Sequence, residues 1–110
     1  MRVFIFSLLL ILSPIASAFS IFSMNLHCGL GDWKSRVDIV VAEILKESHD
    51  VIGLQEVCYN NTMNMGTYIH EQLTKGGYPV KAMETQNTHR SFFKYQEQLL
   101  LISRHEATET

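Results

Sequence analysis

The spacing of hydrophobic residues predicts a strand, a helix and a second strand between residues 19 and 57. Residues 19–26 carry apolar side chains on both faces of a strand, which is typical of a strand covered on two sides. An amphipathic helix follows, because apolar residues recur at helical spacing (Val37, Val40, Val41, Ile44 and Leu45). Asp32 is its expected N-cap, and the helix is expected to end near Ser48. Residues 51–57 form a short apolar run, so we predict a βαβ unit with parallel strands and a right-handed crossover.

The pattern is weaker after this unit. Residues 67–75 predict a short helix that turns Tyr68, Ile69 and Leu73 inward and ends at the glycine pair that follows. A strand is expected next, with Pro79 placing it at a sheet edge or at a strand start. We predict a polar loop at residues 60–64, this strand at residues 78–83 and a turn at residues 85–88. Two extended stretches follow, at residues 91–95 and 98–103.

The first 18 residues predict an export signal. A short positive start precedes an apolar run at residues 3–12, Pro14 breaks the helix, and residues 16–18 form an A-x-A cleavage site. The apolar run is shorter than the roughly 18 residues of a membrane span, which disfavours the alternative of an uncleaved anchor. We therefore expect cleavage near Ala18, a periplasmic or secreted protein without a stable membrane span, and one domain from residue 19 to residue 110.

Composition and charge narrow the possible functions. The chain of 110 residues is 46% hydrophobic and 18% charged, which is typical of a globular protein and excludes disordered and collagen-like classes. Its formal net charge of −2 provides no positive surface for nucleic acid or anionic membranes. If the protein handles phosphates, the positive charge must therefore come from a bound metal or from residues outside this chain.

Two cysteines lie just past the ends of the two predicted parallel strands. Neighbouring strands run about 4.8 Å apart, which is compatible with a disulfide between Cys28 and Cys58 in an oxidising compartment. The alternative is a pair of free, buried thiols that pack as small apolar side chains.

Asn25 and Glu56 are the residues most suited to metal chemistry. Each stands near the carboxyl end of its predicted strand, and open α/β sheets bind ligands at that edge. A carboxylate and an amide oxygen are hard ligands suited to Mg²⁺, which needs only one or two carboxylates beside water and phosphate oxygens. The alternatives are an Asn25 that hydrogen-bonds its own turn and a Glu56 that faces solvent.

These residues carry a resemblance to a known superfamily. Met24-Asn25-Leu26-His27, the amphipathic helix and the run D-V-I-G-L-Q-E-V at residues 50–57 resemble the opening of the endonuclease/exonuclease/phosphatase superfamily. The resemblance implies an α/β fold, namely the front part of a four-layer α/β sandwich of two packed mixed β-sheets flanked by helices, beginning with the βαβ unit. It also implies that Glu56 is the Mg²⁺ ligand and Asn25 a second metal-site residue, with Mn²⁺ or Ca²⁺ as alternative ions.

A later segment extends the resemblance. Residues 90–99 are similar to the tyrosine-x-glutamate-glutamine strand of secreted deoxyribonuclease I-like members, which implies that Glu97 hydrogen-bonds a catalytic histidine. The superfamily's later motifs, G-D-(F/W)-N and a terminal S-D-H, orient the attacking water and contact the scissile phosphate. No G-D-x-N follows Glu56, and S-D-H does not occur in the sequence. We therefore expect a truncated domain that is inactive by itself.

The function implied by the resemblance is that of an exported, Mg²⁺-dependent hydrolase of phosphoester bonds. The preferred substrate is DNA, which a phosphodiesterase or endonuclease would cleave. The alternatives within the superfamily are the phospholipid sphingomyelin and an inositol phosphate. An alternative from another class is a non-catalytic, truncated fragment. Two further residues are left open: His27 either approaches phosphate or packs, and Arg36 lies on a solvated face or in a salt bridge.

Overall fold

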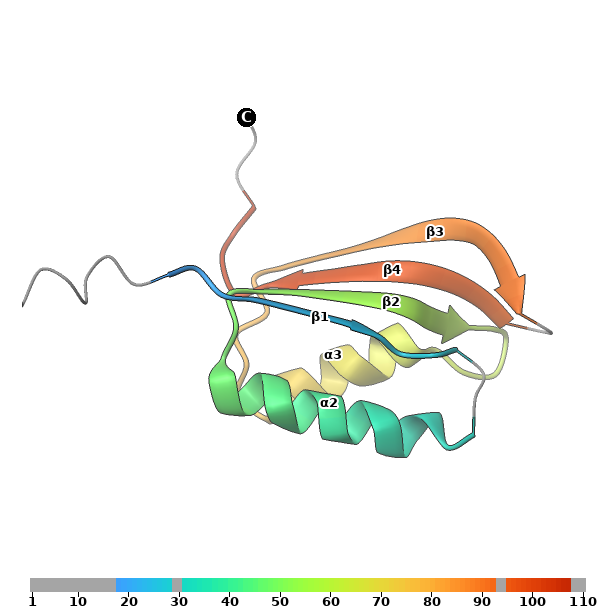
Figure 1. Cartoon of the computed structure of the whole chain (residues 1–110), viewed down its shortest axis with the longest axis horizontal. Coiled ribbons are helices and arrows are strands. Elements are labelled where there is room, and N and C mark those ends of the chain that lie inside the picture. Colours follow the sequence, from blue (N-terminus) through green and yellow to red (C-terminus); the bar gives the residue numbers. More distant parts are fainter. Residues whose placement is uncertain (1–17, 29–30, 93–94, 108–110) are drawn as a thin grey trace, which may run out of the picture.

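Two helices cover one face of a mixed sheet (Figure 1). The computed structural model describes residues 18–28, 31–92 and 95–107, so the predicted export signal up to residue 17 lies outside the described residues. The elements in chain order are β1 (Ile21–Asn25), α2 (Trp33–Glu47), β2 (Val51–Tyr59), α3 (Met65–Lys75), β3 (Ala82–Phe92) and β4 (Tyr95–Ser103). The strand order across the sheet is β1-β2-β4-β3. Within the described ranges, no helix is long and apolar enough to cross a membrane.

The predicted parallel strands and the helix between them are confirmed. β1 pairs with β2 in parallel, from Ile21 opposite Val51 to Asn25 opposite Gln55. The Asp32 side chain caps α2 by accepting a hydrogen bond from the Ser35 N–H at 3.2 Å. Helix α2 ends at Ser48, which takes a left-handed conformation, and its buried residues belong to the predicted apolar set (Val37, Val40, Val41 and Ile44).

The expectation that the first strand is covered on two sides is wrong. β1 is an edge strand, and its burial pattern is mostly exposed, with Ile21 67% and Met24 42% exposed. Phe22 packs partly against the core below the sheet. Apolar residues on both faces therefore do not mean that both faces are covered within the described part of the chain.

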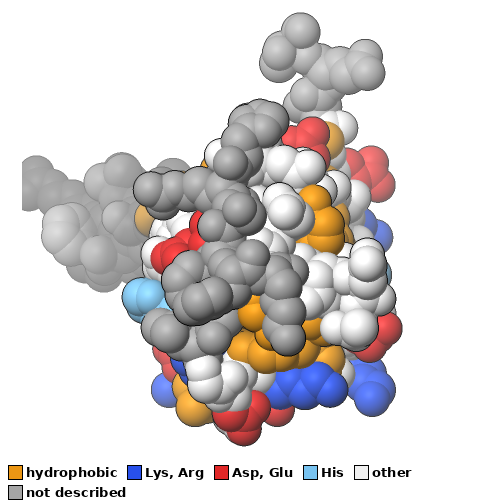
Figure 2. Space-filling model, turned by 90° about the vertical axis from the view of Figure 1, so that its right-hand side faces the viewer, with side chains coloured by type: hydrophobic (Ala, Val, Ile, Leu, Met, Phe, Trp, Pro, Cys, Tyr) orange, Lys and Arg blue, Asp and Glu red, His pale blue; other side chains and the backbone are white. Residues whose placement is uncertain are grey.

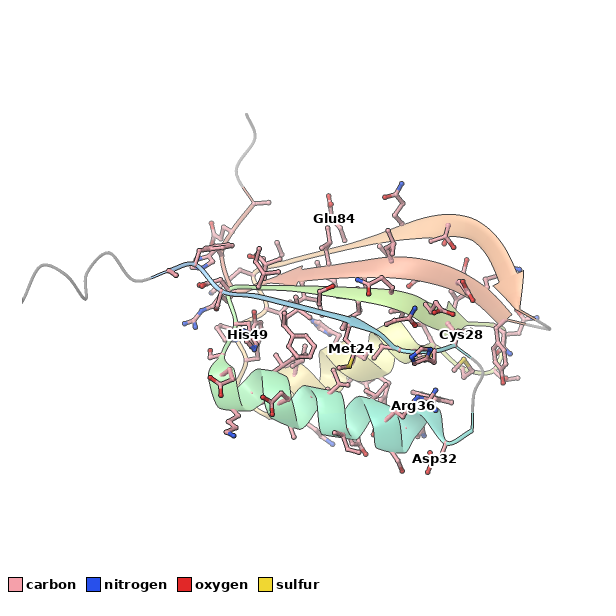
Figure 3. All side chains as sticks on the ribbon, viewed as in Figure 1. Met24, Cys28, Asp32, Arg36, His49 and Glu84 are labelled. Atoms are coloured by element: carbon pink, nitrogen blue, oxygen red, sulfur yellow. A yellow bond between two sulfur atoms is a disulfide. The ribbon has the colours of Figure 1, made fainter. Side chains whose placement is uncertain are left out.

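Side chains of the central strands alternate between a buried face and an open face. Leu100 and Ile102 of β4 are buried toward the helices, whereas Leu99 and Leu101 are 38% and 50% exposed on the opposite face. Figure 3 shows Glu84 of β3 pointing away from the helices on that open face. The described residues thus form one sheet layer and one helix layer, and the four-layer sandwich stays a prediction.

The helix of the second half is confirmed and begins earlier than expected. Helix α3 starts at Met65, two residues before the predicted start, because the Asn64 side chain caps it by accepting a hydrogen bond from Thr67 N–H at 3.0 Å. Its buried residues include Ile69 and Leu73, as predicted.

The predicted strand and turn at residues 78–88 need correction. Tyr78 does not belong to a strand, because its N–H donates to the Leu73 carbonyl of α3 at 2.9 Å, and β3 begins only at Ala82. Its ring is buried, and its hydroxyl donates to the His49 carbonyl at 2.6 Å. The expected turn at residues 85–88 lies inside β3, where Thr85 pairs with Leu100. The polar run that suggested a turn belongs to an edge strand with solvent-facing side chains.

The carboxylate of Asp50, directly before β2, connects three segments of the chain. It accepts hydrogen bonds from the Ser20 N–H at 2.8 Å and the Ser20 hydroxyl at 3.2 Å, and its other oxygen lies 2.6 Å from His105 Nε2. The Phe19 ring stacks on the His105 ring with centroids 6.0 Å apart. The Ser20 N–H, and after it the His105 ring, lower the pKa of Asp50 from 3.8 to about 2.

We predict that Asp50→Asn destabilises the chain at neutral pH and has little effect in acid. Because the folded pKa of Asp50 lies below its ordinary value, the carboxylate stabilises the fold above about pH 4 and loses this contribution as the pH falls toward about 2. Urea unfolding of both proteins across this range measures the difference in midpoint. Glu47→Gln, at an exposed acid of α2, is the control. Equal midpoints for Asp50→Asn and wild type at neutral pH would contradict the prediction.

Candidate metal site at the ends of β1 and β2

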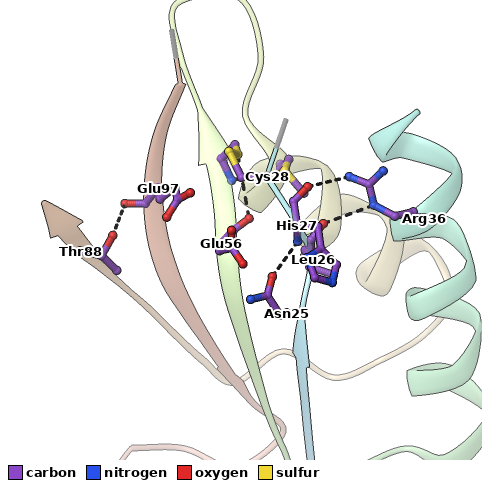
Figure 4. Close-up of a disulfide and its surroundings, with 10 residues drawn as sticks. Asn25, Leu26, His27, Cys28, Arg36, Glu56, Thr88 and Glu97 are labelled. Carbon is purple, nitrogen blue, oxygen red and sulfur yellow. Dashed lines mark hydrogen bonds between the residues drawn. A yellow bond between two sulfur atoms is a disulfide. The ribbon is translucent and has the colours of Figure 1, made fainter. Parts of the chain in front are cut away.

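Asn25 and Glu56 lie side by side at one edge of the sheet (Figure 4). Asn25 is the last residue of β1 and pairs with Gln55, the residue before Glu56. The parallel register therefore brings the two predicted metal-site residues to neighbouring positions. Their role as metal ligands stays a prediction.

Glu56 has an unusual backbone conformation that its sequence does not reveal. Its φ is 54°, and the pairing of β2 with β4 shifts register between Leu54 and Val57, which marks a β-bulge. A left-handed residue that is not glycine costs on the order of 1–3 kcal/mol and persists only where the surroundings enforce it. The bulge turns a half-buried carboxylate out of the regular alternation of the strand.

Asn25 forms the local hydrogen bond that was the alternative to a metal role. Its Oδ1 accepts a hydrogen bond from the His27 N–H at 2.8 Å, and His27 takes a left-handed φ of 53°. An amide oxygen has two lone pairs, so this bond leaves one of them for a metal ion. The His27 side chain is exposed rather than packed in the core.

Arg36 forms backbone contacts that the expectation of a solvated face or a salt bridge did not include. The residue is half-buried, its Nε donates to the Leu26 carbonyl at 3.3 Å, and a terminal nitrogen donates to the His27 carbonyl at 3.0 Å. Figure 3 shows Arg36 on the side of α2 that faces the end of β1. The two carbonyls belong to the residues that directly follow β1, and the first turn of α2 lies beside them. The long arginine side chain can therefore reach both.

A disulfide joins Cys28 to Cys58, so the alternative of two free thiols does not apply. The Cα atoms are 5.4 Å apart, and both residues are buried, at 3% and 0% exposure. The bridge ties the loop after β1 to β2, two residues beyond Glu56. It therefore fixes the two segments that carry the candidate metal-site residues relative to each other.

Glu97 lies on the strand next to Glu56. It belongs to β4, pairs with Cys58 and is only 8% exposed. Asn25, Glu56 and Glu97 therefore stand on three adjacent strands (Figure 4). The hydrogen bond that Glu97 is suggested to accept from a catalytic histidine stays a prediction.

The donors at this edge fit Mg²⁺ as an incomplete ligand set. In the parts of the chain that the structure describes, no group of three or more His, Cys, Asp or Glu residues is arranged to hold a metal ion. One carboxylate from Glu56 and one amide oxygen from Asn25 suit a hard ion that keeps several water molecules. An open groove of about 460 Å³ lies between β1 and α2, and it does not include Glu56; its lining is mostly apolar (Met24, Asn25, Leu26, His27, Arg36, Ile39 and Val40). Figure 2 shows acidic, basic and hydrophobic side chains together among the described residues at this end of the molecule.

Comparison with solved structures finds a relative of known family. The chain is similar to an endonuclease/exonuclease/phosphatase family protein from Leptotrichia buccalis C-1013-b, with 26% sequence identity and a TM-score of 0.74. The match covers 84% of this chain and 40% of that one, so the chain spans less than half the length of the matched structure. No protein-family model matches the sequence. No curated protein matches it either.

We predict that reducing the disulfide lowers the free energy of unfolding by about 3–4 kcal/mol. The bridge closes a loop with a sequence separation of 30, and opening it restores chain entropy to the unfolded state. Urea unfolding with and without a phosphine reductant measures the loss, and mass spectrometry after alkylation counts the thiols. A variant with both Cys28→Ser and Cys58→Ser should not respond to the reductant. Two alkylated thiols in unreduced, folded protein would contradict the bridge.

Proposed function

Because this chain has the fold of the amino-terminal part of the endonuclease/exonuclease/phosphatase superfamily, we propose that it supplies the metal-holding part of a Mg²⁺-dependent phosphodiesterase. The observation that carries the proposal is the adjacency of Asn25 and Glu56 at the ends of two parallel strands. The superfamily consists of phosphoester hydrolases. The two hard oxygen donors at the ligand-binding edge of the sheet suit a metal ion, so both observations support metal-dependent hydrolysis of phosphoester bonds.

Each residue of the site has a distinct part in this proposal. The Glu56 carboxylate supplies the negative charge that holds the ion, and its bulge sets the direction of that carboxylate. Asn25 supplies a neutral oxygen whose orientation is fixed by the His27 N–H. These two residues would hold the ion, which would supply positive charge to a scissile phosphate. His27 is exposed beside Asn25 and can donate a hydrogen bond to a phosphate oxygen.

DNA is the proposed substrate class, and the proposed location is outside the cytoplasm. The DNA assignment rests on the likeness of the segment around Glu97 to secreted deoxyribonuclease I-like enzymes. Export is supported by the amino-terminal signal pattern and by the Cys28–Cys58 disulfide, since such bridges persist in oxidising compartments. The net charge of −2 means that contacts to the DNA backbone come chiefly from the metal and from residues outside this chain.

We predict that Glu56→Gln weakens Mn²⁺ binding to the purified chain at least about tenfold. The substitution removes the charge that holds the ion and keeps the side-chain volume, so the urea midpoint should stay close to that of wild type. Titration followed by electron paramagnetic resonance measures free Mn²⁺, with Mg²⁺ as competitor. Glu84→Gln, at an exposed acid on the open face of the sheet, is the matched control. Equal affinity of Glu56→Gln and wild type would refute the metal site.

We predict that the 110-residue chain alone does not cleave plasmid DNA in the presence of Mg²⁺. Metal binding alone cannot align water and phosphate, and the sequence has no G-D-x-N after Glu56 and no S-D-H. A longer reading frame that contains this chain and both motifs should cleave, and Glu56→Gln should reduce its rate by on the order of 10² or more. EDTA-sensitive cleavage by the chain alone would contradict the first expectation. An inactive longer protein would contradict the proposed function.

A further inference from the structure

We propose that Arg36 is a positioning residue for the metal site. It holds the backbone that follows β1 so that Asn25 presents its amide oxygen beside Glu56. The inference rests on the proposed function and concerns a residue outside the two predicted ligands. Arg36 touches neither Asn25 nor Glu56 in any contact described above, and its action passes through the main chain of Leu26 and His27.

The chain leaves the sheet directly after Asn25. The Leu26 N–H still bonds to the Gln55 carbonyl at 2.9 Å, which continues the pairing with β2. The Leu26 and His27 carbonyls are instead paired with Arg36, on the first turns of α2. Leu26 is 2% exposed, so water has little access to its carbonyl and a protein donor is required. The planar guanidinium bonds two successive carbonyls at once, which fixes the direction of the chain between them.

The same turn determines the orientation of Asn25. His27 is left-handed, and it is bonded at both ends: its carbonyl accepts from Arg36 and its N–H donates to Asn25 Oδ1. Without the hydrogen bond from Arg36, His27 would return to a negative φ, because a positive φ is sterically unfavourable for residues other than glycine. Its N–H would then turn away, and the Asn25 side chain would lose the bond that selects its rotamer. Cys28, the next residue, is fixed independently by the disulfide.

The electrostatic effect of Arg36 on a cation opposes its positioning effect, and this makes the proposal testable. A guanidinium near a metal site repels the ion, so removing its charge should tighten binding if charge alone matters. If Arg36 acts by positioning, removing it should weaken binding despite the lost repulsion. The sign of the change therefore separates the two roles.

The test uses Arg36→Met, which keeps the apolar stem without the donors, and Arg36→Lys, whose ammonium can serve one carbonyl. Lys46→Met, which removes an exposed positive charge near the other end of α2, is the matched control. Mn²⁺ is the probe, and its affinity is followed by paramagnetic broadening of the Asn25 side-chain amide resonances. Hydrogen exchange of the His27 amide reports the turn without any metal.

We expect Arg36→Met to weaken Mn²⁺ binding about tenfold and to speed His27 exchange, Arg36→Lys to recover part of both, and Lys46→Met to match wild type. Unchanged or tighter Mn²⁺ binding in Arg36→Met, even with a lower urea midpoint, would overturn the proposal and leave Arg36 a structural role. If wild type shows no Mn²⁺ binding that depends on Glu56, the proposed function fails and this inference fails with it. If wild type binds Mn²⁺ in a way that depends on Glu56, but the Arg36 substitutions do not change that affinity, only this inference fails.

Discussion

Parallel pairing of β1 with β2, in the register that sets Asn25 opposite Gln55, decides where the candidate side chains of this protein lie. The pairing is maintained from below by α2, whose apolar face is buried against the sheet, and at one end by the disulfide. A shift of one residue would turn every side chain of β1 to the other face and separate Asn25 from Glu56. The stability of the core and the geometry of the site therefore depend on the same contact.

The site combines rigid support with few charges. Between Asn25 and Cys28, three contacts hold the chain: the hydrogen bond to the Asn25 side chain, the hydrogen bond from the Arg36 guanidinium and the disulfide. Glu56 is held in a left-handed conformation by the bulge between β2 and β4. Such support lowers the reorganisation needed when a ligand binds, because the donors already stand in place. In the proposed metal site, the geometry of Asn25 and Glu56 would therefore be set before an ion binds.

The sequence allowed the βαβ unit to be predicted, because apolar spacing, the Asp32 cap and the stop at Ser48 are local signals. The adjacency of Asn25 and Glu56 followed from the rule that parallel strands end at one edge. The turn expected at residues 85–88 failed because polar residues on an exposed edge strand look like those of a turn. The φ of Glu56 and the carbonyl contacts of Arg36 depend on segments that meet only in three dimensions, so no local pattern encodes them.

The strand order has a consequence for the order in which the sheet can form. β4 comes last among the described strands, yet it lies between β2 and β3. β3 and β4 are neighbours in sequence and can pair as a hairpin, whereas β2 pairs with β4 across a long loop, from Val51 opposite Ser103 onward. Long-range pairs form slowly because loop closure precedes any gain from the contacts. Until residues 95–103 pair with it, β2 presents an open edge, and during this interval the chain is most exposed to pairing with another copy of itself.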